Sequence, residues 1–239
     1  MNTMIVLLTI GIFTGFFVQT ITGFAGALIA LPFLLFVMPL PDAIGYLSIF
    51  YMISTPFHVY KEWKYIDKSL LKKLALSSFF GLLIGIIVLS YGQPTILKKG
   101  LGIFILLFVL HNILSNKEIQ IVSKMKFFFG FLGGFFSGVF STGGPLYLVI
   151  VKNETSDVKI MRATMFGVLG LITVMRIPVL AFEGILTVDQ FYNSLYVLPF
   201  FILALVLGKK VYLKLNEIIL KRIMLGLLFL SGMVLVFKN

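Results

Sequence analysis

The sequence predicts an all-α polytopic membrane protein with two inverted repeats, each a broken or re-entrant helical hairpin plus three transmembrane helices. Three observations lead to this prediction. The chain of 239 residues is 59% hydrophobic and only 12% charged, more apolar than a soluble domain of this size. It divides into apolar segments near the roughly 20 residues that a membrane-spanning helix needs. Two of these segments are interrupted by glycine-rich turns at matching places in the two halves.

The first half, residues 1–116, begins with an apolar segment that is too long for one helix. A continuous helix over residues 1–41 would be about 60 Å long, twice the thickness of the hydrocarbon core. The turn TGFAG at Thr22–Gly26 divides this segment, so we expect a hairpin over residues 4–39. Three single helices are expected after it, at residues 43–60, 74–91 and 97–115.

The second half, residues 117–239, repeats this plan. Its first apolar segment carries Gly130, Gly134 and Gly138 four residues apart, which gives a helix a smooth face for close packing. The segment then breaks at Gly143-Gly144-Pro145, because proline has no backbone N–H to continue a helix. We therefore expect a hairpin over residues 127–151 and helices at 163–182, 190–208 and 221–237.

The basic residues indicate the orientation. With each hairpin counted as two passes, loops on one face carry five, three, three and five basic residues, which is sixteen of the 20 in the chain. With four passes per half the distribution is almost even. The positive-inside rule therefore favours ten passes, inverted halves and both termini outside the cytoplasm. We expect a multi-pass protein of the inner or plasma membrane of a prokaryote.

Composition also argues against several classes of function. The net charge of +11 lies in short loops between apolar segments, which is typical of topology signals rather than of nucleic-acid binding. The chain has no cysteine, no zinc-protease motif, no phosphate-binding loop and no cluster of acids for a metal ion. The sequence thus predicts neither an enzyme nor a bound cofactor or metal.

The two breaks are the candidate binding site. At each break the second helix begins within the membrane, near Gly26 and near Gly144, where unpaired N–H groups and the helix dipole favour an anion. Acidic residues are absent from the apolar segments, which argues against a cation substrate. The alternative is tight helix packing, with hydroxyl groups bonded to their own backbone. The residues predicted to line the substrate site are Gln19, Thr22, Gly23, Gly26, Ser137, Ser141, Thr142, Gly143, Gly144 and Arg176.

Three polar residues outside the two breaks lie in or beside apolar segments. Arg176 is a functional candidate because charges within membranes are rare, although a position about six residues from the end of its segment also allows its side chain to reach the outer interface. His58 and Arg162 are candidates for gating or coupling. The competing interpretations are a packing histidine and an arginine that only sets topology, and for Arg162 we favour the latter.

At these residues the chain resembles the TauE/SafE sulfite exporter family of membrane permeases. The resemblance rests on Gly15–Pro32, on Gly133–Leu146, on Arg162-Ala163-Thr164 and on the LKK and LKR sequences before the last helix of each half. The chain is poorer in glycine than the family pattern, with Ala25 and Ser141 where glycine is expected. Membership implies transport of a small sulfur-containing or organic anion such as sulfite, a sulfonate or thiosulfate.

The sequence therefore predicts a secondary transporter of a small anion that works by alternating access within membrane lipids. Two alternatives remain open. One is a membrane assembly factor or receptor that transports nothing and uses its glycine faces to bind partner helices; the other is a passive anion channel. Coupling to a proton or another ion, and a homodimer, are compatible with the sequence but not specified by it.

Overall fold

The computed structural model describes residues 3–114, 123–212 and 217–237, which form ten α-helices and no strand. The helices are α1 (Thr3–Thr22), α2 (Gly26–Leu34), α3 (Leu40–Glu62), α4 (Lys68–Tyr91), α5 (Pro94–Leu114), α6 (Ser123–Phe140), α7 (Gly144–Lys152), α8 (Val158–Phe182), α9 (Val188–Tyr212) and α10 (Glu217–Phe237). A short 3₁₀ helix, η1 (Trp63–Tyr65), follows α3. The predicted all-helical fold is confirmed.

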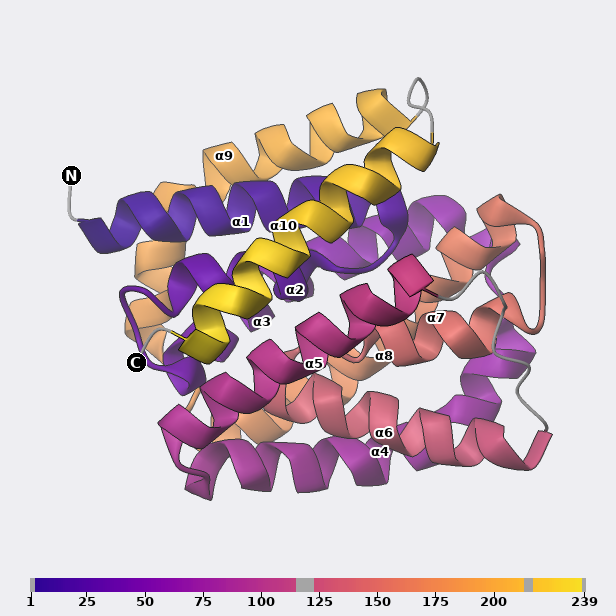
Figure 1. Ribbon diagram of the computed structural model, residues 1–239, viewed down its shortest axis with the longest axis horizontal. Coiled ribbons are helices and arrows are strands. Elements are labelled where there is room, and N and C mark those ends of the chain that lie inside the picture. The colour runs from indigo at the N-terminus through magenta and orange to yellow at the C-terminus, as the bar shows by residue number, and fades with distance from the viewer. Residues whose placement is uncertain (1–2, 115–122, 213–216, 238–239) are drawn as a thin grey trace.

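Each predicted break separates a long helix from a helix of nine residues, α2 or α7. The two members of each pair pack against each other as an antiparallel hairpin. In the first hairpin, Gly11 lies against Leu34 and Gly15 against Gly26. In the second, Gly133 lies against Tyr147. Figure 1 shows that α1 begins at the left of the molecule and α6 at the right, so the two hairpins enter from opposite sides.

The regularly spaced glycines bring helix backbones into contact, as the sequence predicts. A Cβ on Gly134 would lie 2.1 Å from the carbonyl oxygen of Ser78, and one on Gly81 would lie 2.0 Å from that of Phe131. Such distances exclude any side chain without movement of the backbone. Helix α6, the longer helix of the second hairpin, therefore packs closely against α4, and this contact fixes its position.

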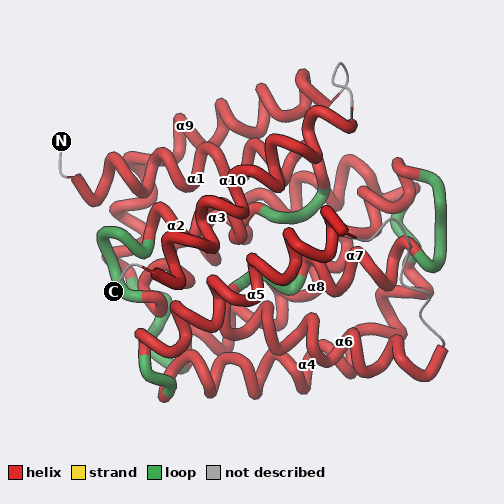
Figure 2. Tube along the Cα trace, in the orientation of Figure 1, coloured by secondary structure: helices red, strands yellow, loops and turns green. Residues whose placement is uncertain are grey.

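The remaining helices arrange around these hairpins in a regular way. Helix α1 packs on α9, just as α6 packs on α4, while α3 pairs with α8 and α5 pairs with α10. Figure 1 shows α5 and α10 crossing the front of the molecule, and Figure 2 shows that the described connections between helices are short. Helix α3 contacts α2 of the first hairpin and α8 contacts α6 and α7 of the second, so the α3–α8 pair touches both hairpins.

Five of the described helices are long and apolar enough to cross a membrane, namely α1, α4, α5, α8 and α9. Helix α3 has the length but carries more polar groups, including Ser48, Ser54, Thr55 and His58. These four residues are buried in the protein and do not face lipid. A central position thus explains why α3 is less apolar than its neighbours.

Candidate functional site

Both helix breaks contain a residue in the left-handed conformation. Ala25 has φ of 71° and Ser141 has φ of 56°, and they are the only positive-φ residues other than glycine in the described part of the chain. This conformation costs a residue with a side chain roughly 1–2 kcal/mol. These are the two positions where glycine was expected, so the glycine-type backbone is kept although the residues differ.

The tips of the two hairpins meet at one small cavity. It has a volume of about 10 Å³, close to the space that a single water molecule needs. The first tip contributes Ala25, Ala27 and Leu28, and the second contributes Ser141, Thr142, Gly144 and Pro145. Tyr51 of α3 and Leu169 of α8 complete the lining. The N-terminal turns of α2 and α7 therefore face the same space.

Two polar groups at this cavity differ in how they are satisfied. The hydroxyl of Tyr51 accepts a hydrogen bond of 3.1 Å from the backbone N–H of Ala27, in the first turn of α2. The hydroxyl of Thr142 is buried and has no hydrogen-bond partner in the structure. A buried hydroxyl without a partner is unfavourable by about 1–3 kcal/mol, so Thr142 is a good candidate for contact with a ligand.

Arg176 lies directly behind the cavity wall. Its guanidinium donates hydrogen bonds to the hydroxyl of Ser141 and to the carbonyl oxygen of Ser137, and it lies 5.2 Å from the centre of the Tyr51 ring. Only 2% of the residue is exposed, and no described carboxylate pairs with it. The alternative in which Arg176 reaches the outer interface is therefore wrong, because its side chain points inward to the second break.

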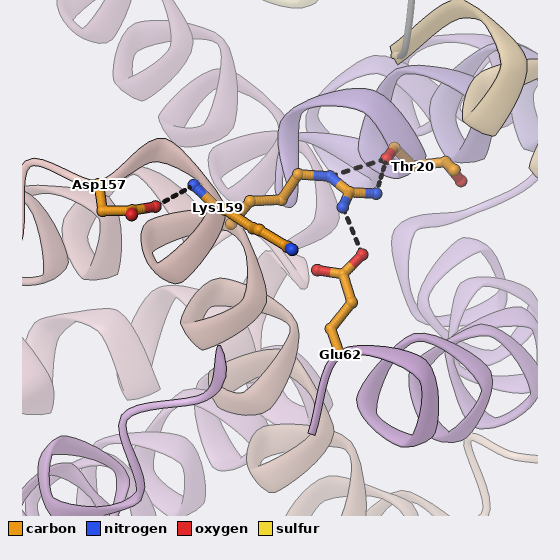
Figure 3. Close-up of polar contacts among 5 residues, drawn as sticks. Thr20, Glu62, Asp157 and Lys159 are labelled. Atoms are coloured by element: carbon orange, nitrogen blue, oxygen red, sulfur yellow. Dashed lines mark hydrogen bonds and ion pairs between the residues drawn. The ribbon is translucent and has the colours of Figure 1, made fainter. Parts of the chain in front are cut away.

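Arg162 occupies the corresponding place at the first break. Figure 3 shows its two partners, the carbonyl oxygen of Thr20 near the end of α1 and the carboxylate of Glu62 at the end of α3. Arg162 is 7% exposed, and its guanidinium also lies 4.1 Å from the centre of the Tyr212 ring. The interpretation of Arg162 as a charge that only sets topology is wrong, because the side chain joins α8 to α1 and α3.

The predicted site residues of the first hairpin are only partly brought to the cavity. Gln19 is fully buried beside Gly26, with neither amide atom hydrogen-bonded. Thr22 uses its hydroxyl within the turn, where it lies 2.7 Å from the carbonyl oxygen of Phe24 and 3.0 Å from that of Val18. Gly23 has φ of 83° and packs against Arg162. Thr22 and Gly23 therefore shape the break and do not line the cavity.

The second hairpin brings more of its predicted residues together. Ser141, Thr142 and Gly144 line the cavity, whereas Gly143 packs against Gly133 and Ser137 within the hairpin. A Cβ on Gly144 would lie 3.1 Å from the Cβ of Phe24, so the two tips are in direct contact. The second break thus supplies most of the polar lining.

His58 lies away from the cavity, on the side of Arg162. Its ring stacks on Phe166 with 4.1 Å between ring centres, and its Nε2 has no hydrogen-bond partner. The guanidinium of Arg162 lies 4.9 Å from the centre of the Phe166 ring. This arrangement fits a packing histidine next to a buried ion pair.

Sequence reasoning missed Tyr51 and Glu62. Tyr51 is one of several tyrosines in α3, and only the fold reveals that its hydroxyl meets the start of α2. Glu62 lies at the end of α3 among lysines, so its pairing with Arg162, 100 residues away, has no local signal. No local sequence signal distinguishes Tyr51 from the other tyrosines of α3.

A family model described as sulfite exporter TauE/SafE matches residues 7–235, nearly the whole chain. The protein belongs to the TauE/SafE family. No curated protein and no solved structure matches the chain. Family membership and the apolar helices make it a multi-pass membrane transport protein. The family match also supports the earlier expectation of a small anionic substrate in a lipid environment.

Proposed function

We propose that this TauE/SafE protein is a secondary transporter that carries a small anion, such as sulfite, a sulfonate or another sulfur-containing or organic anion, by alternating access. The anion binds between the hairpin tips, at the cavity that both breaks line. The observation that carries the proposal is the uncompensated charge of Arg176, because a buried cation without a carboxylate favours a bound anion.

The surrounding groups suit an anion and not a cation. The first turns of α2 and α7 direct the positive ends of two helix dipoles toward the cavity. Among the described residues, Thr142 offers a hydroxyl without a hydrogen-bond partner, and none of those that line the cavity is acidic. A divalent oxyanion would compensate Arg176 and accept hydrogen bonds from Thr142 and from backbone N–H groups.

The size of the cavity and the opposed hairpins support the proposal of alternating access. A space of about 10 Å³ is too small for an anion of four or more heavy atoms, so the tips must separate to admit one. The equivalent packing of α1 on α9 and of α6 on α4 supports the proposal of two inverted repeats, residues 1–116 and 117–239. In this proposal the hairpins open alternately to opposite sides.

The test uses two threonine variants in proteoliposomes. Thr142→Val keeps the shape and removes the hydroxyl that would contact the anion, so sulfite flux should fall about tenfold or more. Thr173→Val is the matched control, because the Thr173 hydroxyl bonds to the carbonyl oxygen of Leu169 in its own helix, 2.7 Å away. Flux should change little in that variant.

The outcomes separate the proposal from its alternatives. Equal flux in wild type and Thr142→Val would disprove the site while leaving transport intact. An absence of flux for every anion tested would instead favour the membrane assembly factor or receptor. Flux that neither saturates nor shows counter-transport would favour a passive channel.

A further inference from the structure

A large groove lies between α3 and α9, away from the hairpin cavity. Its volume is about 540 Å³, in the range of small-molecule sites. The floor and walls are apolar and consist of Ile53, Phe57, Phe201, Ile202, Leu205 and Val206. Several of these side chains are exposed, including Ile202 at 51%, and they lie on α9, a helix apolar enough to cross a membrane, or on α3 beside it. The groove is thus open to the lipid phase.

One end of the groove is strongly basic. Lys61, in the last turn of α3, and Lys209 and Lys210, in the last turn of α9, all line it. The Nζ of Lys61 lies 3.7 Å from the centre of the Phe57 ring, which holds this ammonium over the apolar wall. None of the three lysines forms an ion pair with a described carboxylate. The rim therefore carries three positive charges without internal compensation.

We propose that this groove binds an anionic phospholipid, with its acyl chains along the apolar wall and its phosphate at Lys61, Lys209 and Lys210. The combination of a long apolar wall and a cationic end matches the two parts of such a lipid. A free anion would use the lysines but would have no use for the wall. The proposal is independent of the anion site between the hairpins.

A lipid in this position would contact both α3 and α9, which pack against different parts of the protein. Helix α3 carries Tyr51 of the cavity and Glu62 of the Arg162 ion pair, whereas α9 packs on α1 of the first hairpin. Glu62 directly follows Lys61 in the chain. The bound lipid would therefore hold α3 against α9 beside the break of the first hairpin.

The experiment measures lipid retention by native mass spectrometry of the full chain in detergent. Dioleoylphosphatidylglycerol should be retained in preference to dioleoylphosphatidylcholine, which has the same chains and no net charge. Lys209→Gln together with Lys210→Gln should lower phosphatidylglycerol affinity about 30-fold, since each lysine near a membrane surface contributes roughly a factor of five. The matched control is Lys72→Gln with Lys73→Gln, two adjacent exposed lysines in α4 outside the groove.

A second variant tests the apolar wall. Val206→Trp should fill the groove and reduce phosphatidylglycerol retention with no change of charge, while Leu107→Trp on the exposed face of α5 should leave it unchanged. A large excess of inorganic phosphate should not displace the lipid. Equal retention of both lipids, equal loss in the two lysine pairs, or displacement by phosphate would overturn the proposal. A dimer in detergent that dissociates on Val206→Trp would also overturn it, because the groove would then be an interface between copies.

Discussion

Helix α8 carries two buried arginines that hold the two helix breaks in similar ways. Arg162 donates hydrogen bonds to the carbonyl oxygen of Thr20 in the last turn of α1, and Arg176 donates one to that of Ser137 in the last turn of α6. Carbonyl groups in the last turn of a helix can lack a partner within the helix, as that of Thr20 does, whereas the carbonyl of Ser137 also accepts from the backbone N–H of Ser141. Each side chain thus joins α8 to the end of the helix that precedes a break, and the two lie about four helical turns apart.

The two arginines differ in how their charges are compensated. Glu62 pairs with Arg162, whereas Arg176 has only hydroxyl and carbonyl oxygens and an aromatic ring around it among the described residues. A buried charge without an opposite charge is unfavourable by several kcal/mol. In the proposed mechanism, Glu62 compensates the charge at the first break, while the transported anion compensates the charge at the second.

The largest expected effect comes from removing the uncompensated charge. Arg176→Gln should abolish sulfite flux in proteoliposomes, with a loss of more than about 100-fold, because the anion loses the buried cation beside its proposed site. The variant should also lose stabilisation by sulfite, which in the wild type should reach roughly 2.7 kcal/mol at 100 times the dissociation constant. Flux and thermal unfolding with and without sulfite measure both effects.

Arg162→Gln is the matched control for this prediction. It removes the arginine of the other break, so folding stability should fall but stabilisation by sulfite should remain. Without sulfite, Arg176→Gln should lose less stability than Arg162→Gln, because removal of an uncompensated buried charge offsets the lost hydrogen bonds to Ser137 and Ser141. Normal sulfite flux in Arg176→Gln would contradict the assignment of the anion to the second break.

A smaller effect is expected from the compensated arginine. Glu62→Gln leaves Arg162 buried without its carboxylate and should lower the free energy of unfolding by about 2 kcal/mol, less than the 3–5 kcal/mol of fully buried pairs. The loss is expected to be smaller than for a fully buried pair because the Glu62 side chain is 18% exposed. Denaturant titration in detergent measures the change.

A double-mutant cycle shows whether this loss belongs to the ion pair. Glu62→Gln combined with Arg162→Gln should destabilise the protein by less than the sum of the two single variants, because the second substitution removes the orphaned charge. Strict additivity would mean that Glu62 and Arg162 do not stabilise each other, and the comparison with Arg176 would lose its basis.

Much of the fold could be predicted because its signals are local. The excess length of residues 1–41 and the turn at Gly143-Gly144-Pro145 required two broken segments, and both breaks lie where predicted. The spacing of Gly130, Gly134 and Gly138 predicted a close helix contact, which α4 provides. The division into two inverted repeats stays a prediction, although the helix packing supports it.

The candidate site was harder to predict because its contacts join distant residues. The sequence position of Arg176 is compatible with a side chain that points inward or outward. Only the packing of α8 on the second hairpin shows that it points inward. Arg162 was assigned to topology because its partners, Thr20 and Glu62, are more than 90 residues away. The position of Thr22 beside the break predicts that it lines the site, yet its hydroxyl is used by the turn.

The smallest expected effect compares the two left-handed residues. Ala25→Gly should raise the free energy of unfolding by about 0.5–1 kcal/mol, because relief of the left-handed strain exceeds the added entropy of glycine in the unfolded chain. Ser141→Gly gains the same relief but removes the hydroxyl that accepts from Arg176. A hydrogen bond to a charged group contributes about 1.5–3 kcal/mol, so this variant should be less stable than wild type by about 1 kcal/mol. Denaturant titration of both variants should therefore give shifts of opposite sign. Stabilisation by both would show that Arg176 does not depend on Ser141, and the link between the second break and the uncompensated charge would fail.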